Sequence, residues 1–137
     1  LDELGFAVVQ TYSFVGRDDP AARRVLTAPR ERYGIPGAEA VKSPMGVAHA
    51  YDLMHLLAQA TDWAGSTDRA AVRAALENLG PYDVLVRHYD QPFTAERHDA
   101  LSPAEVFMAR MTADDRILPL PRAGATPAAD QARDQAE

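Results

Sequence analysis

Four histidines and several acidic residues are the side chains in this sequence that could bind a metal or take part in acid–base catalysis. His49 and His55 both fall in one strongly apolar stretch, where a helical zinc site could be built. Helices that bind zinc place two histidines four residues apart, so that both imidazoles share one face. His49 and His55 are six residues apart, which puts them about 120° out of alignment on a helix. This spacing argues against a shared metal ion.

His98 and Asp99 are adjacent and could form the acid–base part of a small hydrolase site. Adjacent positions alone do not make a dyad, and a triad also needs a positioned nucleophile. The candidate nucleophiles Ser43 and Ser102 have no strand–turn–helix elbow around them. We therefore keep a hydrolase using His98 and Asp99 only as an alternative to solvated loop residues.

Other signatures of metal or cofactor chemistry are missing from the sequence. It has no GxGxxG or GxxxxGK[ST] loop that could cradle phosphate, and it has no cysteine. Paired carboxylates occur in "RDDP" (17–20) and "TADDR" (112–116), but without the alternating oxygen ligands and the Glu of a calcium loop. We interpret these pairs as a helix cap and a turn, and we expect no cofactor, no metal and no enzymatic activity.

The composition is that of a soluble globular protein. The 137 residues are 47% hydrophobic and 25% charged, with a formal net charge of −6. An acidic chain is a poor general partner for nucleic acid or an anionic membrane surface. The absence of cysteine fits either the cytosol or the periplasm.

The elements that must position these residues begin with a predicted strand at 5–14, with "AVV" (7–9) as its buried centre. Asp18, Asp19 and Pro20 can begin a helix that ends at Gly34, and Pro29 predicts a kink or a break within it. The chain enters its first strand almost at once and without Met, so we expect a fragment that lacks an N-terminal part.

A helix–turn–helix pair at about 45–80 is the clearest pattern in the sequence. Its first helix should run from Met45 to Ala64 and be buried on several sides, because its residues are apolar around most of the circumference. Val47, Ala50/Tyr51, Met54 and Leu57/Ala58 form one apolar stripe, and Leu53, Leu56 and Ala60 widen it. Gly65 ends this helix, "STD" (66–68) caps the next, and Gly80-Pro81 stops it.

The remaining sequence predicts a strand at 82–89, a long irregular stretch, and two short strands at 106–120 around a turn at "ADD" (113–115). No large apolar residue follows Leu120, so we expect 121–137 to be a disordered or fraying tail. The folded part is then 1–120.

The order of motifs in this chain resembles the type I periplasmic binding proteins, the leucine/isoleucine/valine-binding family of ABC-transporter receptors. The resemblance rests on Tyr51-Asp52 in a long helix, then "AGSTD" (64–68), then "AAVRAAL" (70–76), with "GFAVVQTYSF" upstream and "VFMARMTADDRILPL" downstream. It covers about residues 5 to 120, the last third of such a receptor. The family usually has glycine near "YDVLV" and in the final turn. Val84 and Asp115 stand there in this chain, and both should weaken the turns.

The resemblance implies an α/β fold with two lobes, each a mostly parallel sheet flanked by helices, which closes by a hinge around a ligand between the lobes. It also implies that the main ligand-binding residues of the N-terminal lobe lie upstream of Leu1. In the family, the loop that enters the "YD" helix lines the cleft, often with an aromatic residue. Gly46 occupies that position here, flanked by Met45 and His49, and Tyr12 could lie near a crossover. For all four of these residues, the alternative is that they only pack in the core or lie in a loop and do not contact a ligand.

The leading hypothesis is thus a C-terminal fragment of a periplasmic substrate-binding protein for an ABC importer. It would bind a small polar solute, such as a branched-chain amino acid or an amide, and dock on a membrane permease. A cytoplasmic ligand-sensing regulator with the same fold is the alternative. One lobe without its partner strands leaves apolar faces and strand edges open, so we also expect marginal stability or self-association.

Overall fold

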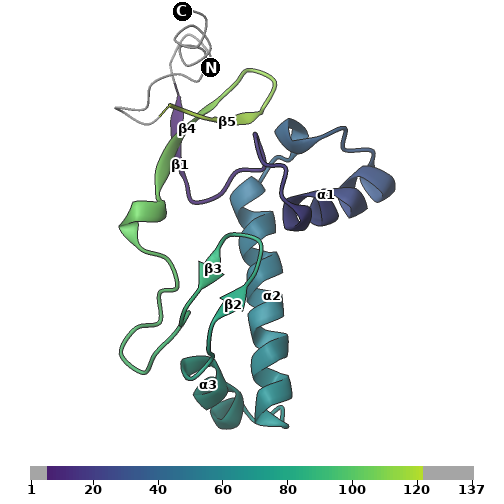
Figure 1. Cartoon of the computed structure of the whole chain (residues 1–137). Helices are drawn as coiled ribbons and strands as arrows, with labels where there is room; N and C mark the ends of the chain where they lie inside the picture. Colours follow the sequence, from purple (N-terminus) through teal and green to yellow (C-terminus); the bar gives the residue numbers. More distant parts are fainter. Residues whose placement is uncertain (1–5, 122–137) are drawn as a thin grey trace, which may run out of the picture.

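A computed structural model of the chain describes residues 6–121 (Figure 1). Its elements, with η for a 3-10 helix, are β1 (Ala7–Gln10), α1 (Pro20–Tyr33), η2 (Ala38–Ala40), α2 (Pro44–Ala64), α3 (Arg69–Glu77), β2 (Tyr82–Asp83), β3 (His88–Tyr89), η3 (Pro103–Glu105), β4 (Phe107–Met111) and β5 (Ile117–Pro119). The tail predicted at 121–137 lies outside the described residues from position 122 onward.

Helices and strands are mixed, as an α/β fold requires, but the strands do not form the predicted parallel sheet. A three-stranded sheet has the order β1-β4-β5, and β2 pairs with β3. Every strand pair within residues 6–121 is antiparallel. Parallel pairing needs two strands that run in the same direction on either side of a crossover. Here β4 returns beside β1 in the opposite direction, with Gln10 opposite Phe107.

The first strand is shorter and more exposed than predicted. It contains only Ala7–Gln10, and Val9 is exposed rather than central to a core. The buried residues come just after the strand, where Tyr12 and Phe14 are each 1% exposed. The chain leaves the sheet at Thr11 because the core between α1 and α2 buries these aromatic rings better than the sheet does.

Helix α1 begins and ends as predicted but is not broken at Pro29. Asp19 caps it by accepting a hydrogen bond from the backbone N–H of Ala22 at 2.9 Å. Gly34 ends it with φ 66°, and the N–H groups of Gly34 and Ile35 bond to carbonyls of the last turn. Of the kink or break predicted at Pro29, the break is therefore wrong: this proline removes one hydrogen bond from a helix whose two ends are well capped.

The predicted helix–turn–helix pair is present as α2 and α3. Helix α2 ends at Gly65 with φ 58°, and Asp68 caps α3 by accepting from the N–H groups of Ala70 and Ala71. Helix α3 stops at Glu77, three residues before Gly80-Pro81, and Asn78 caps it. Figure 1 shows the β2–β3 hairpin beside the middle of α2 and α3 beside its lower end. Among residues 6–121, no helix is long and apolar enough to cross a membrane.

Helix α2 buries Leu56 and Ala60, which widen the predicted stripe, but not the centre of that stripe. Ala48, Asp52, Leu56 and Ala60 face inward at spacings of four residues. Of the predicted stripe, Met54 is 65% exposed. A helix that is apolar on nearly every side offers more than one candidate core face, and periodicity cannot choose between them. In this chain α2 is buried on one side and open on the other.

Two clusters of buried side chains use this inward stripe. The upper cluster joins Ala48 to α1 and to the turn after β2, and it consists of Tyr12, Phe14, Ala22, Val41, Ala48, Leu85 and Val86. The lower cluster consists of Leu56, Ala60 and Leu79, packed against α3 and Tyr82. Helix α2 is therefore the element that connects both parts of the core.

Residues 82–89 form a small hairpin instead of one strand. β2 and β3 are two residues each, with Tyr82 opposite Tyr89. Val84 donates its N–H to the Arg87 carbonyl at 3.3 Å and so closes the turn. Within the described residues, Asp115 is the one non-glycine residue at positive φ. Val84 thus needs no glycine conformation, and the absence of glycine at this position costs no backbone strain.

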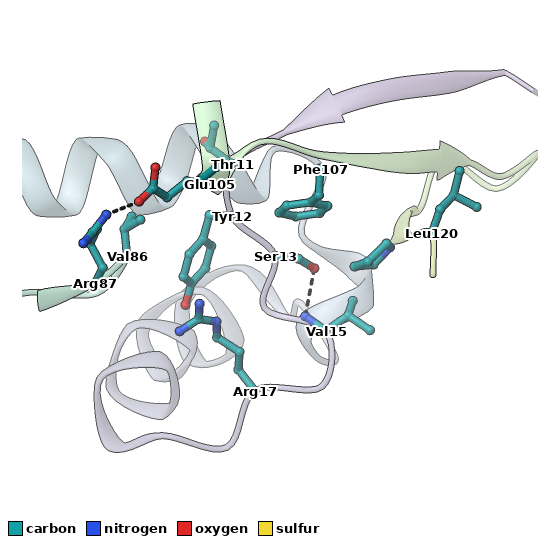
Figure 2. A pocket seen from close by; sticks show the side chains of 12 residues that line it. Thr11, Tyr12, Ser13, Val15, Arg17, Val86, Arg87, Glu105, Phe107 and Leu120 are labelled. Carbon is teal, nitrogen blue, oxygen red and sulfur yellow. Dashed lines mark hydrogen bonds and ion pairs between the residues drawn. The ribbon is translucent and has the colours of Figure 1, made fainter. Parts of the chain in front are cut away.

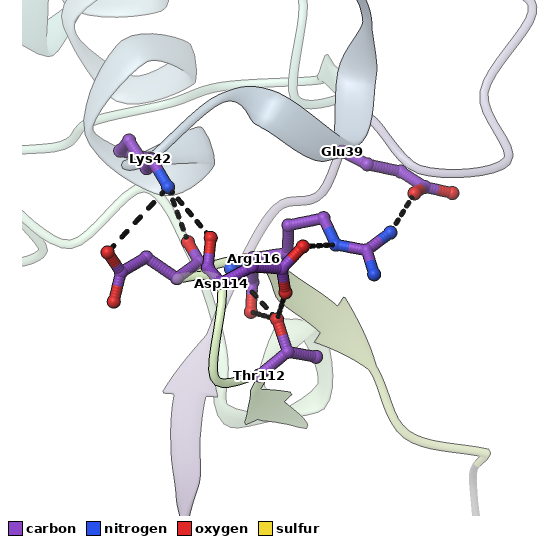
Figure 3. Close-up of polar contacts among 6 residues, drawn as sticks. Glu39, Lys42, Thr112, Asp114 and Arg116 are labelled. Carbon is purple, nitrogen blue, oxygen red and sulfur yellow. Dashed lines mark hydrogen bonds and ion pairs between the residues drawn. The ribbon is translucent and has the colours of Figure 1, made fainter. Parts of the chain in front are cut away.

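The two strands predicted at 106–120 are confirmed as β4 and β5, joined by a turn in which Asp115 has φ 61°. Figure 3 shows how this turn is tied to the segment before α2. Lys42 donates to the Asp114 and Asp115 carbonyls at 3.0 and 3.4 Å, and Arg116 pairs with Glu39 at 2.7 Å. These groups are largely exposed, so each pair contributes little stability by itself.

Candidate functional site

Two cavities border the loop that follows β1. The larger has a volume of about 570 Å³ and lies between α2 and the irregular segment before β4. The smaller has a volume of about 360 Å³ and lies between that loop, the β2–β3 turn and β4 (Figure 2). Thr11 lines both of them. The chain thus brings a strand end, the first turns of a helix and a loop together around one residue.

His49 is the predicted site residue that the structure places in the larger cavity. Its ring atom Nε2 lies 2.8 Å from Thr11 Oγ1, within hydrogen-bonding distance. The contact joins the residue that follows β1 to the second turn of α2 and orients the imidazole. Thr11 is a site residue that the sequence prediction missed, because no local pattern indicates a contact with a residue 38 positions away.

The lining of the larger cavity is mostly apolar with a few polar groups. The apolar part includes Leu53, Leu56, Tyr89, Phe93, Leu101 and Val106, and the polar part includes Thr11, His49, His98, Asp99 and Ser102. Cavities of this size with a few convergent polar groups are typical of sites for small molecules. The arrangement suits a solute with a polar end and a short apolar part.

Asp52 lines this cavity and ties α2 to the turn between β2 and β3. Its two carboxylate oxygens accept hydrogen bonds from the backbone N–H groups of Leu85 at 2.7 Å and Val86 at 2.9 Å. Burial raises the pKa of Asp52, and the two backbone hydrogen bonds oppose that shift. Both oxygens are already engaged, so the role of Asp52 is to fix α2 against the β2–β3 turn rather than to contact a ligand.

Tyr12 lines the smaller cavity rather than the larger one. Its ring packs edge-on against Phe14 with centroids 4.9 Å apart, and the Arg17 guanidinium lies 4.6 Å from the ring centroid. The buried hydroxyl has no hydrogen-bond partner in the described part of the chain. Burial raises the pKa of Tyr12 to about 12, against the lowering effect of Arg17. Figure 2 also shows the ion pair between Arg87 and Glu105 at the rim of this cavity.

Met45 and Gly46 line neither of these two cavities. Met45 is half-buried in the first turn of α2, and Gly46 is exposed. A Cβ atom at position 46 would lie 2.6 Å from Ser43 Oγ, so a larger residue there would require Ser43 to rotate. The structure therefore brings His49 and Tyr12 to cavities and leaves Met45 and Gly46 beside them.

The residues of the hydrolase alternative line the larger cavity but do not form a catalytic arrangement. His98 Nε2 lies 3.4 Å from Glu77 Oε1, so its ion partner is Glu77 rather than Asp99. Ser102 Oγ donates to Glu105 Oε2 as part of a capping box, which leaves it without a histidine base. Within residues 6–121, no group of three His, Asp or Glu side chains could hold a metal ion.

Neither a protein-family model nor a curated protein matches this chain. Among solved structures, it is similar to a crystal structure described as a periplasmic binding protein type 1 from Bordetella pertussis Tohama I. The two share 25% identity over 87% of this chain, with a TM-score of 0.60. The chain spans 34% of the length of that protein. The likeness supports the superfamily predicted from the sequence. Membership of its leucine/isoleucine/valine-binding family and a C-terminal position in a receptor remain predictions.

Proposed function

We propose that this chain is part of a ligand-binding receptor of the type 1 periplasmic-binding-protein kind, in which it forms one side of the binding cleft. The observation that carries this proposal is the structural likeness over 87% of the chain, with a TM-score of 0.60, to a periplasmic binding protein. The larger cavity, which is of a size typical of small-molecule sites, supports the same function. No chemical step is involved; the receptor works by binding and closing.

The ligand we propose is a small polar solute of the amino-acid or amide class. The cavity of about 570 Å³ offers hydrogen-bonding groups from Thr11 and His49 at one end. Leu53, Leu56 and Phe93 offer apolar surface for a short side chain. Met45, Gly46 and Tyr12 would adjoin the ligand when the second side of the cleft closes, as predicted from the sequence.

Delivery of the solute to the membrane permease of an ABC importer, in the periplasm, completes the proposal. Hinge closure around the ligand would create the surface that the permease recognises. The alternative role is that of a cytoplasmic sensor with the same fold. It would use the same cavity but would bind a regulatory partner instead of a permease. Ligand binding is common to both roles and can be tested first.

A thermal-shift screen of leucine, glutamine and propionamide tests the binding site directly. A ligand that binds only the folded chain raises its melting temperature in proportion to the logarithm of its concentration. We expect at least one of these solutes to do so. His49→Ala should abolish the shift, whereas His55→Ala should retain it, because His55 is exposed on the same helix and lies outside the cavity. No shift with any solute, or equal loss in both variants, would contradict the proposed site.

A further inference from the structure

The smaller cavity is lined by a tyrosine whose buried hydroxyl lacks a hydrogen bond. Tyr12 is 1% exposed, and its hydroxyl has no hydrogen-bond partner in the part of the chain that the structure describes. Burial raises the pKa of Tyr12 to about 12, so the hydroxyl keeps its proton at neutral pH and can donate it. Buried polar groups in folded proteins are nearly always hydrogen-bonded, so this hydroxyl indicates a place for an acceptor.

The hydroxyl of Tyr12 points toward the guanidinium of Arg17, as Figure 2 shows. The Cζ atom of Arg17 lies 4.6 Å from the ring centroid of Tyr12. A guanidinium carries hydrogen-bond donors and no acceptor, so it cannot accept the proton of the hydroxyl. A neutral donor and a positively charged donor thus lie together. They are complementary to an anion that has more than one acceptor atom.

Arg17 is available for such an anion. Its ion partner Asp19 lies 3.7 Å away, which is longer than a hydrogen bond, and the Arg17 side chain is 41% exposed. The other carboxylate oxygen of Asp19 is engaged by the N–H of Ala22 at the start of α1. The second arginine that lines the cavity, Arg87, is paired with Glu105. The charge left for a ligand is that of Arg17, which matches one negative charge.

Several walls of the smaller cavity are apolar. They are formed by Val15, Val86, Phe107, Pro119 and Leu120, which come from segments far apart in the sequence. The volume of about 360 Å³ lies within the range of sites for small molecules. An inorganic anion such as phosphate would leave these apolar walls without a contact. The lining therefore fits a small acid that carries an apolar chain.

We propose that the smaller cavity binds a monocarboxylic acid with a short apolar chain. The carboxylate lies between Arg17 and Tyr12 and accepts hydrogen bonds from both, after the exposed Arg17 side chain has turned to admit it. The apolar chain of the acid contacts Phe107 and Leu120. The site is separate from the larger cavity proposed for the solute, since Thr11 is the one described residue that lines both. It therefore does not depend on the proposed function.

Isothermal titration calorimetry of the chain with butyrate, in a buffer without carboxylates, tests the site. Butyrate should give a saturating binding curve. Butyramide has nearly the same shape without the charge, and inorganic phosphate has the charge without the apolar chain. Each of these two should bind at least about tenfold more weakly than butyrate. Equal binding of either compound would overturn the proposal.

Two substitutions locate the bound acid. Tyr12→Phe removes the hydroxyl, Arg17→Gln removes the charge, and each should raise the Kd of butyrate by about tenfold or more. Phenylalanine keeps the ring and leaves no unpaired hydroxyl, so Tyr12→Phe should melt no lower than the native chain. Arg23→Gln is the matched control, because Arg23 is an exposed arginine of α1 outside this cavity. This variant should bind butyrate like the native chain.

The proposal is overturned if butyrate does not bind, or if both variants bind it as tightly as the native chain. An equal loss in Arg23→Gln would also overturn it, because a general attraction of anions would then explain the binding. If Tyr12→Phe melts lower than expected, Arg17→Gln decides, since it changes an exposed side chain that the fold does not need.

Discussion

The carboxylate of Asp52 on α2 accepts a hydrogen bond from the backbone N–H of Leu85 at 2.7 Å, across 33 residues of sequence. The second oxygen accepts from Val86 at 2.9 Å. One buried side chain thereby fixes the β2–β3 turn against the helix that carries His49. The candidate ligand cavity depends on this relationship, because α2 and the segments after the turn form its opposite sides.

Asp52→Ala should destabilise the chain by about 2–4 kcal/mol, because it leaves two buried backbone N–H groups without acceptors. Urea denaturation followed by circular dichroism measures this loss. Asp62→Ala is the control, since Asp62 lies on the same helix but is exposed, and we expect it to change the free energy of unfolding by less than about 0.5 kcal/mol. Equal effects of the two variants would show that the Asp52 contacts do not hold the turn.

The stability contributed by Asp52 should depend on pH. Burial raises its pKa above the ordinary value of 3.8, so the folded chain keeps this proton at a pH where the unfolded chain loses it. The contribution is fully present below the unfolded pKa and is lost as the pH rises through the folded pKa. The free energy of unfolding of the native chain, relative to Asp52→Asn, should therefore fall as the pH rises above 3.8. A relative stability that increases over this range would mean that the two backbone hydrogen bonds outweigh burial.

Alanine substitutions at two glycines test whether the end of α1 has the left-handed backbone conformation. Gly34 has φ 66°, where a side chain is strained, although a Cβ atom would meet nothing within 4 Å. Gly34→Ala should therefore lower the free energy of unfolding by about 1–2 kcal/mol. Gly37 has extended backbone and equally open space, so Gly37→Ala should be neutral or slightly stabilising. Thermal melts of both variants measure the difference, which would vanish if the left-handed cap of α1 did not form.

Asp115 offers the opposite test, because it is a non-glycine residue at φ 61° in the β4–β5 turn. Asp115→Gly should raise the free energy of unfolding by up to about 1 kcal/mol, since glycine adopts this conformation without strain. The ion pair with Lys42, at 3.9 Å between exposed groups, contributes little that could offset the gain. Chemical denaturation against Asp115→Asn, which removes the charge without introducing glycine, separates relief of strain from loss of charge. A loss of stability in both variants would mean that this carboxylate matters more than the backbone conformation.

The features that sequence could predict are those decided by neighbouring residues. Asp19, Gly34, Gly65 and Asp68 begin or end helices through contacts within a few positions, and all four behave as predicted. The hairpin at 106–120 was predictable for the same reason. The paired acidic residues that were considered as metal ligands also have local structural roles. Asp19 caps α1, and Asp115 lies in the turn between β4 and β5.

The features that sequence could not predict depend on distant residues. "YDVLVRHY" alternates like one strand, but Asp52 takes the N–H groups of Leu85 and Val86 and so favours a turn there. The sequence predicted an apolar face of α2 that included both Leu56 and Met54, and only tertiary packing selects Leu56 for the core and leaves Met54 exposed. For the site, the sequence indicated His49 but not Thr11, whose contact with His49 exists only in the folded chain.

The four histidines allow one measurement that tests the proposed binding site most directly. His49 and His98 line the larger cavity, whereas His55 and His88 do not. In proton NMR titrations with leucine, glutamine and propionamide, the ring signals of His49 and His98 should move and saturate together with at least one solute. The signals of His55 and His88 should stay in place and serve as internal controls. The proposed binding site is contradicted if no solute moves the His49 signal, or if all four signals move alike.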